Sequence, residues 1–373
     1  MLVLRVLIFV AGASLVAWTL LSAIRTVVVP RSYSGVLSRF VFSVLLRIFR
    51  FLASERRGFE VRDRIMALYA PVVLVSLPVV WLTLVLVGYM GMFWAVEGTT
   101  WADAFHTSGS SLLTLGFAPV DSLAARVLAF TQAVFGLVLL ALMIAFLPAM
   151  YNIFSRRETQ VALLEVRAGS PPTAVEYLER AHQLGWLSEL PEQFGNWETW
   201  FTELEETHTS YGALAFFRSP HAERSWVTAA GVVLDACSLT ASTLDLPRHP
   251  QADLTIRAGY LALQRIADFY GVAFDPNPLP TDPISIIRAE FDATYDRLAM
   301  AGLPMRVDRE QAWRDFSAWR VNYDKPLLDL AELTMAPYAP WTSDRSAPDR
   351  HRPQVRRWGR RRDQEPITSS SLE

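Results

Sequence analysis

The chain has 373 residues, which is long enough for two or three domains of ordinary size. Hydrophobic residues make up 51% and charged residues 19% of it, against about 25% charged residues in a typical soluble domain. Three runs contain no charged residue, at 6–24, 65–96 and 127–154, and each is close to or above the roughly 20 residues that cross a bilayer. This composition excludes a purely soluble protein and a disordered chain. The single cysteine, Cys237, excludes a disulfide framework and a multi-thiolate metal site.

The net charge of −2 conceals three regions of different sign. Residues 1–157 carry a net charge of +7, residues 158–344 carry −13, and residues 345–373 carry +4. We therefore expect a basic membrane part, an acidic soluble part over 158–340 and a basic, disordered tail over 341–373. The folded part has no basic patch studded with aromatic residues, so no nucleic-acid partner is expected.

Arginines at the ends of the apolar runs indicate the membrane orientation. Arg56, Arg57, Arg62 and Arg64 precede the second run, and Arg156 and Arg157 follow the third. Residues 97–123, between these two runs, contain no lysine or arginine. The positive-inside rule then predicts a multi-pass protein of the inner (plasma) membrane, with a transmembrane helix over 1–30 and a cytoplasmic soluble domain. A cleaved signal peptide is the alternative for the first run.

Residues 35–55 predict an amphipathic helix that lies in the membrane interface. At 100° per residue, Arg39, Arg47 and Arg50 fall within one narrow stripe, and apolar residues fill the remaining surface. Arginines in such a stripe reach lipid headgroups, so membrane lipids are predicted partners. A helix packed on the soluble domain and a fourth span are the alternatives, and a fourth span would place three arginines at depth.

The segment between the second and third runs is too apolar for an ordinary external loop and too short for another span. An amphipathic half-helix over about 101–112 is followed by a compact Thr-Leu-Gly-Phe turn. Non-helical backbone at membrane depth is tolerated where it is buried in protein or lines a water-filled cavity. The pattern therefore predicts a re-entrant loop whose backbone carbonyls can replace the hydration shell of a cation.

In this order of elements the sequence resembles the tetrameric potassium-channel family of pore-loop cation channels. The resemblance covers residues 65–157: an outer helix over 65–96, a pore helix and filter over 101–118, and an inner helix over 124–157 that continues towards Gly169. The filter T-V-G-Y-G of that family aligns with Thr114, Leu115, Gly116, Phe117 and Ala118. The resemblance implies a homotetramer, permeant K⁺ or Na⁺ in the filter, and a gating hinge at Gly136.

Two residues depart from the family pattern. Ala118 replaces the second filter glycine and would cost roughly 1–2 kcal/mol in a left-handed conformation, while Pro119 replaces the usual aspartate. Ser110 stands where some relatives have an acid behind the filter, so any hydrogen-bonded support must come from Ser108, Ser110 or Ser111. We therefore expect either fewer ordered ion sites with weaker discrimination between potassium and sodium, or a filter of altered shape.

Three polar residues are candidates for the pore mouth. His106 either senses pH or is hydrogen-bonded behind the loop. Asp121 either forms an acidic ring with its symmetry mates or caps the inner helix. Asp103 lies on the same half-helix as His106 and is the third candidate for the pore mouth. Gly136 has two interpretations as well, a hinge or a close helix contact.

The soluble half predicts helices joined by Pro- and Gly-bearing connections, without the strand pattern of a nucleotide-binding domain. The predicted helices are 172–184, with Ser170 as the N-cap, then 189–217, 222–244, 251–270, 284–301 and 309–335. Glu198, Glu203, Glu205, Glu206 and His208 form an acidic cluster that suits a solvated face better than a Ca²⁺ site. No catalytic arrangement or metal-binding spacing is recognisable, so no enzyme activity and no cofactor are expected.

Together these features predict an all-α membrane protein with a potassium-channel-like pore module, an extra N-terminal span, an interfacial helix and an all-α cytoplasmic domain. The predicted function is a homotetrameric cation channel gated through the cytoplasmic helical domain by an unknown ligand. A non-conducting membrane-anchored sensor or scaffold is the alternative, and Ala118 and Pro119 are the residues that favour it.

Overall fold

The computed structural model describes residues 1–28, 36–54 and 58–345. In these residues the secondary structure is helical, apart from one isolated β-bridge between Leu244 and Met305. The predicted all-α fold class is therefore confirmed. Within the predicted basic tail, residues 346–373 lie outside the described residues.

The chain divides into two compact units that do not follow the compositional boundary at 157/158. Unit 1 contains Met1–Pro172 and Glu203–Ala229, and unit 2 contains Thr173–Thr202 and the described residues from 230 onward. A stretch of the acidic half therefore belongs to the same unit as the apolar helices. Its contacts are described below, because they occur at the end of the third apolar helix.

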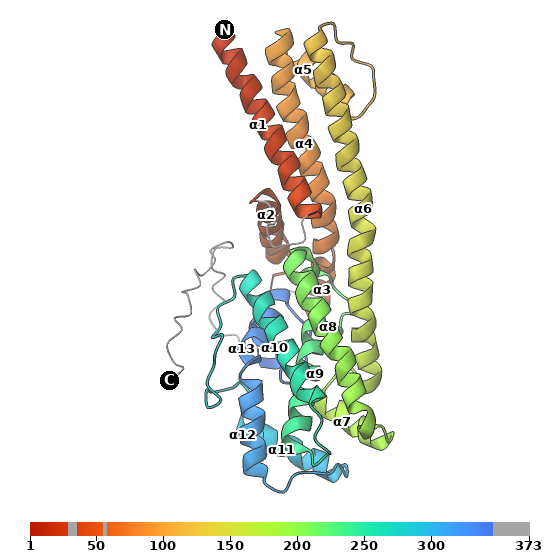
Figure 1. Cartoon of the computed structure of the whole chain (residues 1–373), viewed down its shortest axis with the longest axis vertical. Coiled ribbons are helices and arrows are strands. Elements are labelled where there is room, and N and C mark those ends of the chain that lie inside the picture. Colours follow the sequence, from red (N-terminus) through yellow and green to blue (C-terminus); the bar gives the residue numbers. More distant parts are fainter. Residues whose placement is uncertain (29–35, 55–57, 346–373) are drawn as a thin grey trace, which may run out of the picture. The chain divides into compact units, whose positions relative to one another are not determined.

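Three helical stretches of unit 1 are long and apolar enough to cross a membrane, as predicted. They are α1 (Leu2–Val27), the pair α3 (Phe59–Ala67) and α4 (Tyr69–Glu97), and α6 (Leu123–Ala168). In Figure 1, α1, α4 and α6 run side by side. A single residue, Leu68, separates α3 from α4. Pro71 explains this break, because it has no N–H for the carbonyl of Ala67 and its ring crowds that carbonyl.

Glycines bring the backbones of α1 and α4 into contact. A Cβ on Gly12 would lie 2.4 Å from the carbonyl oxygen of Gly88, and a Cβ on Gly88 would lie 2.7 Å from Cγ2 of Val16. Close approach through small residues stabilises helix pairs in lipid, where the hydrophobic effect between helices is absent. The first apolar helix is thus packed into the core of unit 1.

The amphipathic helix α2 (Val36–Leu52) forms where it was predicted and packs on α1, α3 and α4. The hydroxyls of Ser38 and Thr26 are hydrogen-bonded at 2.7 Å. Arg47 and Arg50 are exposed, and Arg39 is half-buried.

The remaining helices are α5 (Trp101–Leu112), α7 (Ala174–Gln183), η1 (Leu187–Glu189), α8 (Leu190–Ser210), η2 (Gly212–Phe216), α9 (Trp226–Thr243), α10 (Gln251–Phe269), α11 (Arg288–Met300), α12 (Arg309–Arg320), α13 (Asp324–Thr334) and η3 (Ser343–Arg345). Three predictions in this half were wrong. The single helix predicted over 189–217 ends at Ser210 and is followed by the separate 3₁₀ helix η2. The N-cap of α7 is Thr173, whose hydroxyl accepts a hydrogen bond from the N–H of Glu176, and not Ser170. The single helix predicted over 309–335 is two helices, because Pro326 occupies the first turn of α13 and lacks the N–H that a continuous helix needs.

The core of unit 2 contains a buried ion pair. Arg320 is fully buried and donates to Asp235 at 2.6 Å, to Asp324 at 2.7 Å and to the carbonyl of Trp341 at 2.6 Å. Burial alone would lower the pKa of Arg320, but the two carboxylates outweigh it and raise that pKa. Because the charge of Arg320 is buried, removal of one of its carboxylate partners would leave an uncompensated charge in the core.

Candidate functional site

The predicted half-helix between the second and third spans is present as α5, with the predicted bounds of 101 and 112. Thr100 and Asp103 form a capping box at its N-terminus: Thr100 accepts from the N–H of Asp103, and Asp103 accepts from the N–H and hydroxyl of Thr100. These hydrogen bonds from Thr100 lower the pKa of Asp103. Trp101 stacks on Trp94 of α4, with ring centroids 5.0 Å apart. Asp103 therefore begins the helix that positions the turn.

One residue of α5 holds the turn that follows it. The hydroxyl oxygen of Ser110 accepts from the N–H groups of Phe117 at 3.1 Å and Ala118 at 3.2 Å. The carbonyl of Ser110 accepts from the N–H of Leu115 at 2.8 Å. Ser110 is 2% exposed, so these bonds lie inside the packed hairpin. The sequence had left open which of three serines supports the loop, and the structure identifies Ser110.

The direction of these N–H groups determines where the carbonyls of the turn point. In a planar trans peptide unit, the N–H and the C=O point in opposite directions. The N–H groups of residues 115, 117 and 118 point to Ser110, so the carbonyls of Thr114, Gly116 and Phe117 point away from α5. A Cβ on Gly116 would meet no atom within 4 Å. In the single chain, the space into which a Gly116 side chain would extend is therefore open.

Two residues of the turn have left-handed backbone angles. Positive φ angles occur at Thr114 (55°) and Gly116 (74°), whereas Ala118 does not have one. Ala118 therefore does not carry the cost that a left-handed conformation would impose on it. A β-branched residue at positive φ is an outlier, and a cost of about 1–2 kcal/mol falls on Thr114.

A buried polar chain behind the turn joins three helices. Gln132 of α6, which is fully buried, donates to the hydroxyl of Ser108 at 2.8 Å, and Ser108 donates to the carbonyl of Leu86 in α4 at 2.9 Å. Sequence analysis missed Gln132. Its signal is an amide in the apolar run 127–154, which contains only Gln132 and Asn152 of this type, because a polar side chain there needs a partner inside the bundle.

Gly136 packs directly on the end of α5. A Cβ at this position would lie 2.4 Å from the carbonyl oxygen of Leu112 and 3.2 Å from its Cδ1. Of the two interpretations of Gly136, this contact favours close packing, because the residue lies within the continuous helix α6.

His106 and Asp121 are both exposed in the single chain. The ring of His106 meets the ring of Phe117 edge to face, with centroids 6.3 Å apart. Ser122, and not Asp121, is the N-cap of α6, since its hydroxyl accepts from the N–H of Ala125. The capping role considered for Asp121 is therefore wrong.

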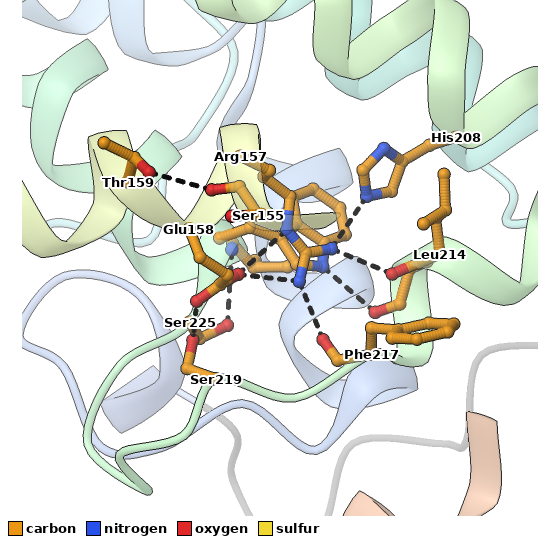
Figure 2. A network of polar contacts seen from close by, with 12 residues as sticks. Ser155, Arg157, Glu158, Thr159, His208, Leu214, Phe217, Ser219 and Ser225 are labelled. Atoms are coloured by element: carbon orange, nitrogen blue, oxygen red, sulfur yellow. Dashed lines mark hydrogen bonds and ion pairs between the residues drawn. The ribbon is translucent and has the colours of Figure 1, made fainter. Parts of the chain in front are cut away.

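A second polar centre lies near the C-terminal end of α6, around Arg157 (Figure 2). Its Nη1 donates to the carbonyl of Leu214 and its Nη2 to that of Phe217, each at 2.8 Å. Nε and Nη2 donate to Glu158 at 2.9 and 2.7 Å, and Nη1 lies 3.1 Å from Nε2 of His208. From the sequence, Arg157 was only a charge that marked the inner side of the membrane. The signal for its burial is that it follows Met150 by seven residues and precedes Val161 and Leu164 on the buried stripe of α6.

The predicted acidic cluster does not form a metal site. The described residues contain no group of three or more His, Cys, Asp or Glu side chains that could hold a metal ion. Its members have other contacts: Glu198 accepts from Gln251 at 2.6 Å, Glu203 pairs with Arg156, and His208 is buried beside Arg157.

No family model, curated protein or solved structure matches this chain. The fold and the site define the chain as an all-helical membrane protein with three helices able to span a bilayer. Its distinctive feature is a short helix and turn inserted between the second and third of these helices.

Proposed function

We propose that the chain is the subunit of a homotetrameric cation channel, related to the pore-loop channels that its residues 65–157 resemble. In this proposal α3–α4 is the outer helix, α5 is the pore helix, residues 114–118 are the filter and α6 is the inner helix. The soluble part is cytoplasmic, and the protein resides in the plasma membrane.

The single observation that carries the proposal is the anchoring of the turn by Ser110. Because three N–H groups of the turn bond to this residue, the carbonyls of Thr114, Gly116 and Phe117 are directed away from α5. Four copies around an axis would bring these oxygens together and replace the hydration shell of a cation. One turn per chain provides one quarter of such a ring, so the proposal requires four chains.

The charge pattern supports cations over anions. Asp103 and Asp121 are exposed on the segment that contains the turn, and residues 97–123 contain no lysine or arginine. Rings of acidic side chains concentrate cations at the entrance of a pore.

Potassium and sodium flux into liposomes containing the purified protein tests the proposal. Gly116→Asp should abolish flux, because a side chain at φ 74° is strained and a carboxylate would fill the open side of the turn. Ser110→Ala removes the acceptor of two N–H groups, each worth about 1–3 kcal/mol when left unsatisfied, and should lower potassium over sodium selectivity or abolish flux.

Ser111→Ala is the matched control, because the hydroxyl of Ser111 makes no hydrogen bond to the turn within the described residues, and it should conduct like the wild type. Flux that persists in Gly116→Asp would refute the filter assignment. Particle images of a monomer or dimer would refute the channel itself.

A further inference from the structure

A short segment between α8 and α9, residues 211–219, packs on two of the long helices at once. On α6, Tyr211 meets Phe146 with ring centroids 6.0 Å apart, and Phe217 meets Phe154 at 5.4 Å. Leu214 is buried in the same cluster. We call these residues the clasp segment.

The same segment also contacts α3 and the start of α4. The ring of Phe216 lies edge-on to Tyr69 at 5.3 Å. Arg218 donates to Asp63 of α3 at 2.6 Å, and both side chains are nearly buried, with exposed fractions of 11% and 12%. The apolar cluster joins Leu74 of α4 to the segment as well. The clasp segment therefore connects the N-terminal end of α3–α4 to the C-terminal half of α6.

Arg157 joins α6 to this segment by charged hydrogen bonds. Its guanidinium donates to two backbone carbonyls of the segment and to Glu158, as Figure 2 shows. Glu158 in turn accepts from the hydroxyl of Ser219. Hydrogen bonds that involve a charged group are roughly twice as strong as neutral ones, and these lie in a nearly dry environment, since the Arg157 side chain is 5% exposed.

The backbone continues from the clasp segment into unit 2 on both sides. α8 begins in unit 2 and leads into the segment, and α9 leads from it back into unit 2. A movement of α8 or α9 would thus pull on the segment directly through the covalent chain.

We propose that residues 211–219 are a releasable clasp that holds α6 against α3–α4, with Arg157 as its latch, and that its release is the movement that opens the proposed pore. The inference rests on the proposed function in one respect, the link to conduction. The mechanical part, that the segment restrains both helices, is independent of whether ions pass.

The test compares Arg157→Gln with Arg156→Gln in the full-length protein reconstituted in lipid. Arg156 is the adjacent residue with the same charge, but its side chain is 72% exposed, and within the described residues its ion pair is with Glu203. Amide hydrogen exchange reports the clasp, and liposome flux reports the pore. In Arg157→Gln we expect exchange of residues 212–219 and of the start of α4 to accelerate about tenfold or more, which corresponds to losing one hydrogen bond to a charged group. Ion flux through Arg157→Gln should rise, whereas a collapsed structure would conduct less. Arg156→Gln should match the wild type in both exchange and flux.

A second pair of variants keeps the test valid if Arg157→Gln fails to fold. Asp63→Arg should release the segment from α3, and Asp63→Arg combined with Arg218→Asp should restore slow exchange and the flux of the wild type. Exchange confined to residues 212–219, or equal effects of Arg156→Gln and Arg157→Gln on exchange, would overturn the clasp. Flux that falls while exchange rises would overturn its role in opening the pore. If no form of the protein conducts, the channel proposal fails, and the exchange measurements alone decide whether the clasp exists.

Discussion

The contact between Gly136 and α5 gives the sharpest prediction for the proposed pore. Replacing Gly136 by alanine places a Cβ 2.4 Å from the carbonyl oxygen of Leu112, whereas ordinary van der Waals contact begins at 3.4 Å. The neighbour is backbone and cannot rotate away, so the end of α5 must move by about 1 Å relative to α6. Overpacking of this kind costs about 1–3 kcal/mol, and a backbone clash belongs at the upper end of that range.

The helix propensity of alanine offsets part of this cost. Glycine is about 1 kcal/mol less favourable than alanine inside a helix. A clash of about 3 kcal/mol against a gain of about 1 kcal/mol leaves a net destabilisation of roughly 2 kcal/mol per subunit. The displacement also moves Ser110, two residues before Leu112, and with it the acceptor that orients the turn.

The assay is thermal unfolding of the purified protein, measured as the loss of the assembled form on size exclusion, together with liposome flux. Gly136→Ala should unfold at a lower temperature and lose potassium over sodium selectivity. Gly109→Ala is the matched control, because a Cβ on Gly109, in α5 itself, meets no atom of the chain within 4 Å. Leu112→Ala should not rescue Gly136→Ala, since the closest contact is with a backbone oxygen. If Gly136→Ala changes flux but leaves thermal unfolding unchanged, the residue is a hinge and the packing argument is wrong.

Two further predictions concern titration and lipid contact. Burial of the ring and, second to it in size, the positive charge of Arg157 hold the pKa of His208 well below its ordinary value of 6.5. Below pH 6.5, the folded protein therefore binds fewer protons at His208 than the unfolded chain does. The free energy of unfolding should be constant with respect to His208 above pH 6.5 and fall below it by at most about 1.4 kcal/mol per pH unit, and His208→Gln should remove this slope from melting curves recorded between pH 5 and 7.5. Arg47→Gln combined with Arg50→Gln should weaken retention of anionic lipid, measured against zwitterionic lipid by native mass spectrometry, by about 1 kcal/mol per arginine. Arg257→Gln removes one arginine at an exposed position of α10 and should leave that ratio unchanged. A loss there equal to the loss per arginine on α2 would contradict an interfacial role for α2.

The helices whose signals lie between neighbouring residues of the chain could be predicted from the sequence. Three uncharged runs predicted three helices, and a run of about 20 apolar residues has few alternatives to a helix in lipid. The stripe of Arg39, Arg47 and Arg50 predicted α2, and the amphipathic pattern over 101–112 predicted α5, whose capping box of Thr100 and Asp103 lies within four residues of sequence. Each of these signals operates between residues that are neighbours in the chain.

The anchoring of the turn depends on contacts that the sequence does not specify. Three serines occur in α5, and only the fold determines that Ser110 faces the turn while Ser108 faces Gln132. The strained residue of the turn was not identified from the sequence either. Thr114 has the positive φ angle, whereas the N–H of Ala118 bonds to Ser110 without one.

The boundary between the two units also depends on contacts that the sequence does not specify. Composition placed it at 157/158, because the charge and hydropathy of the chain change there. Arg157, however, is bonded to residues on the other side of that boundary, at Glu158, His208, Leu214 and Phe217. The apolar run 213–217 inside an acidic region indicates burial, but a run of five residues does not identify what buries it. A charge that marks the inner end of a membrane helix can also be the residue that fastens a distant segment to it, and only the fold separates the two roles.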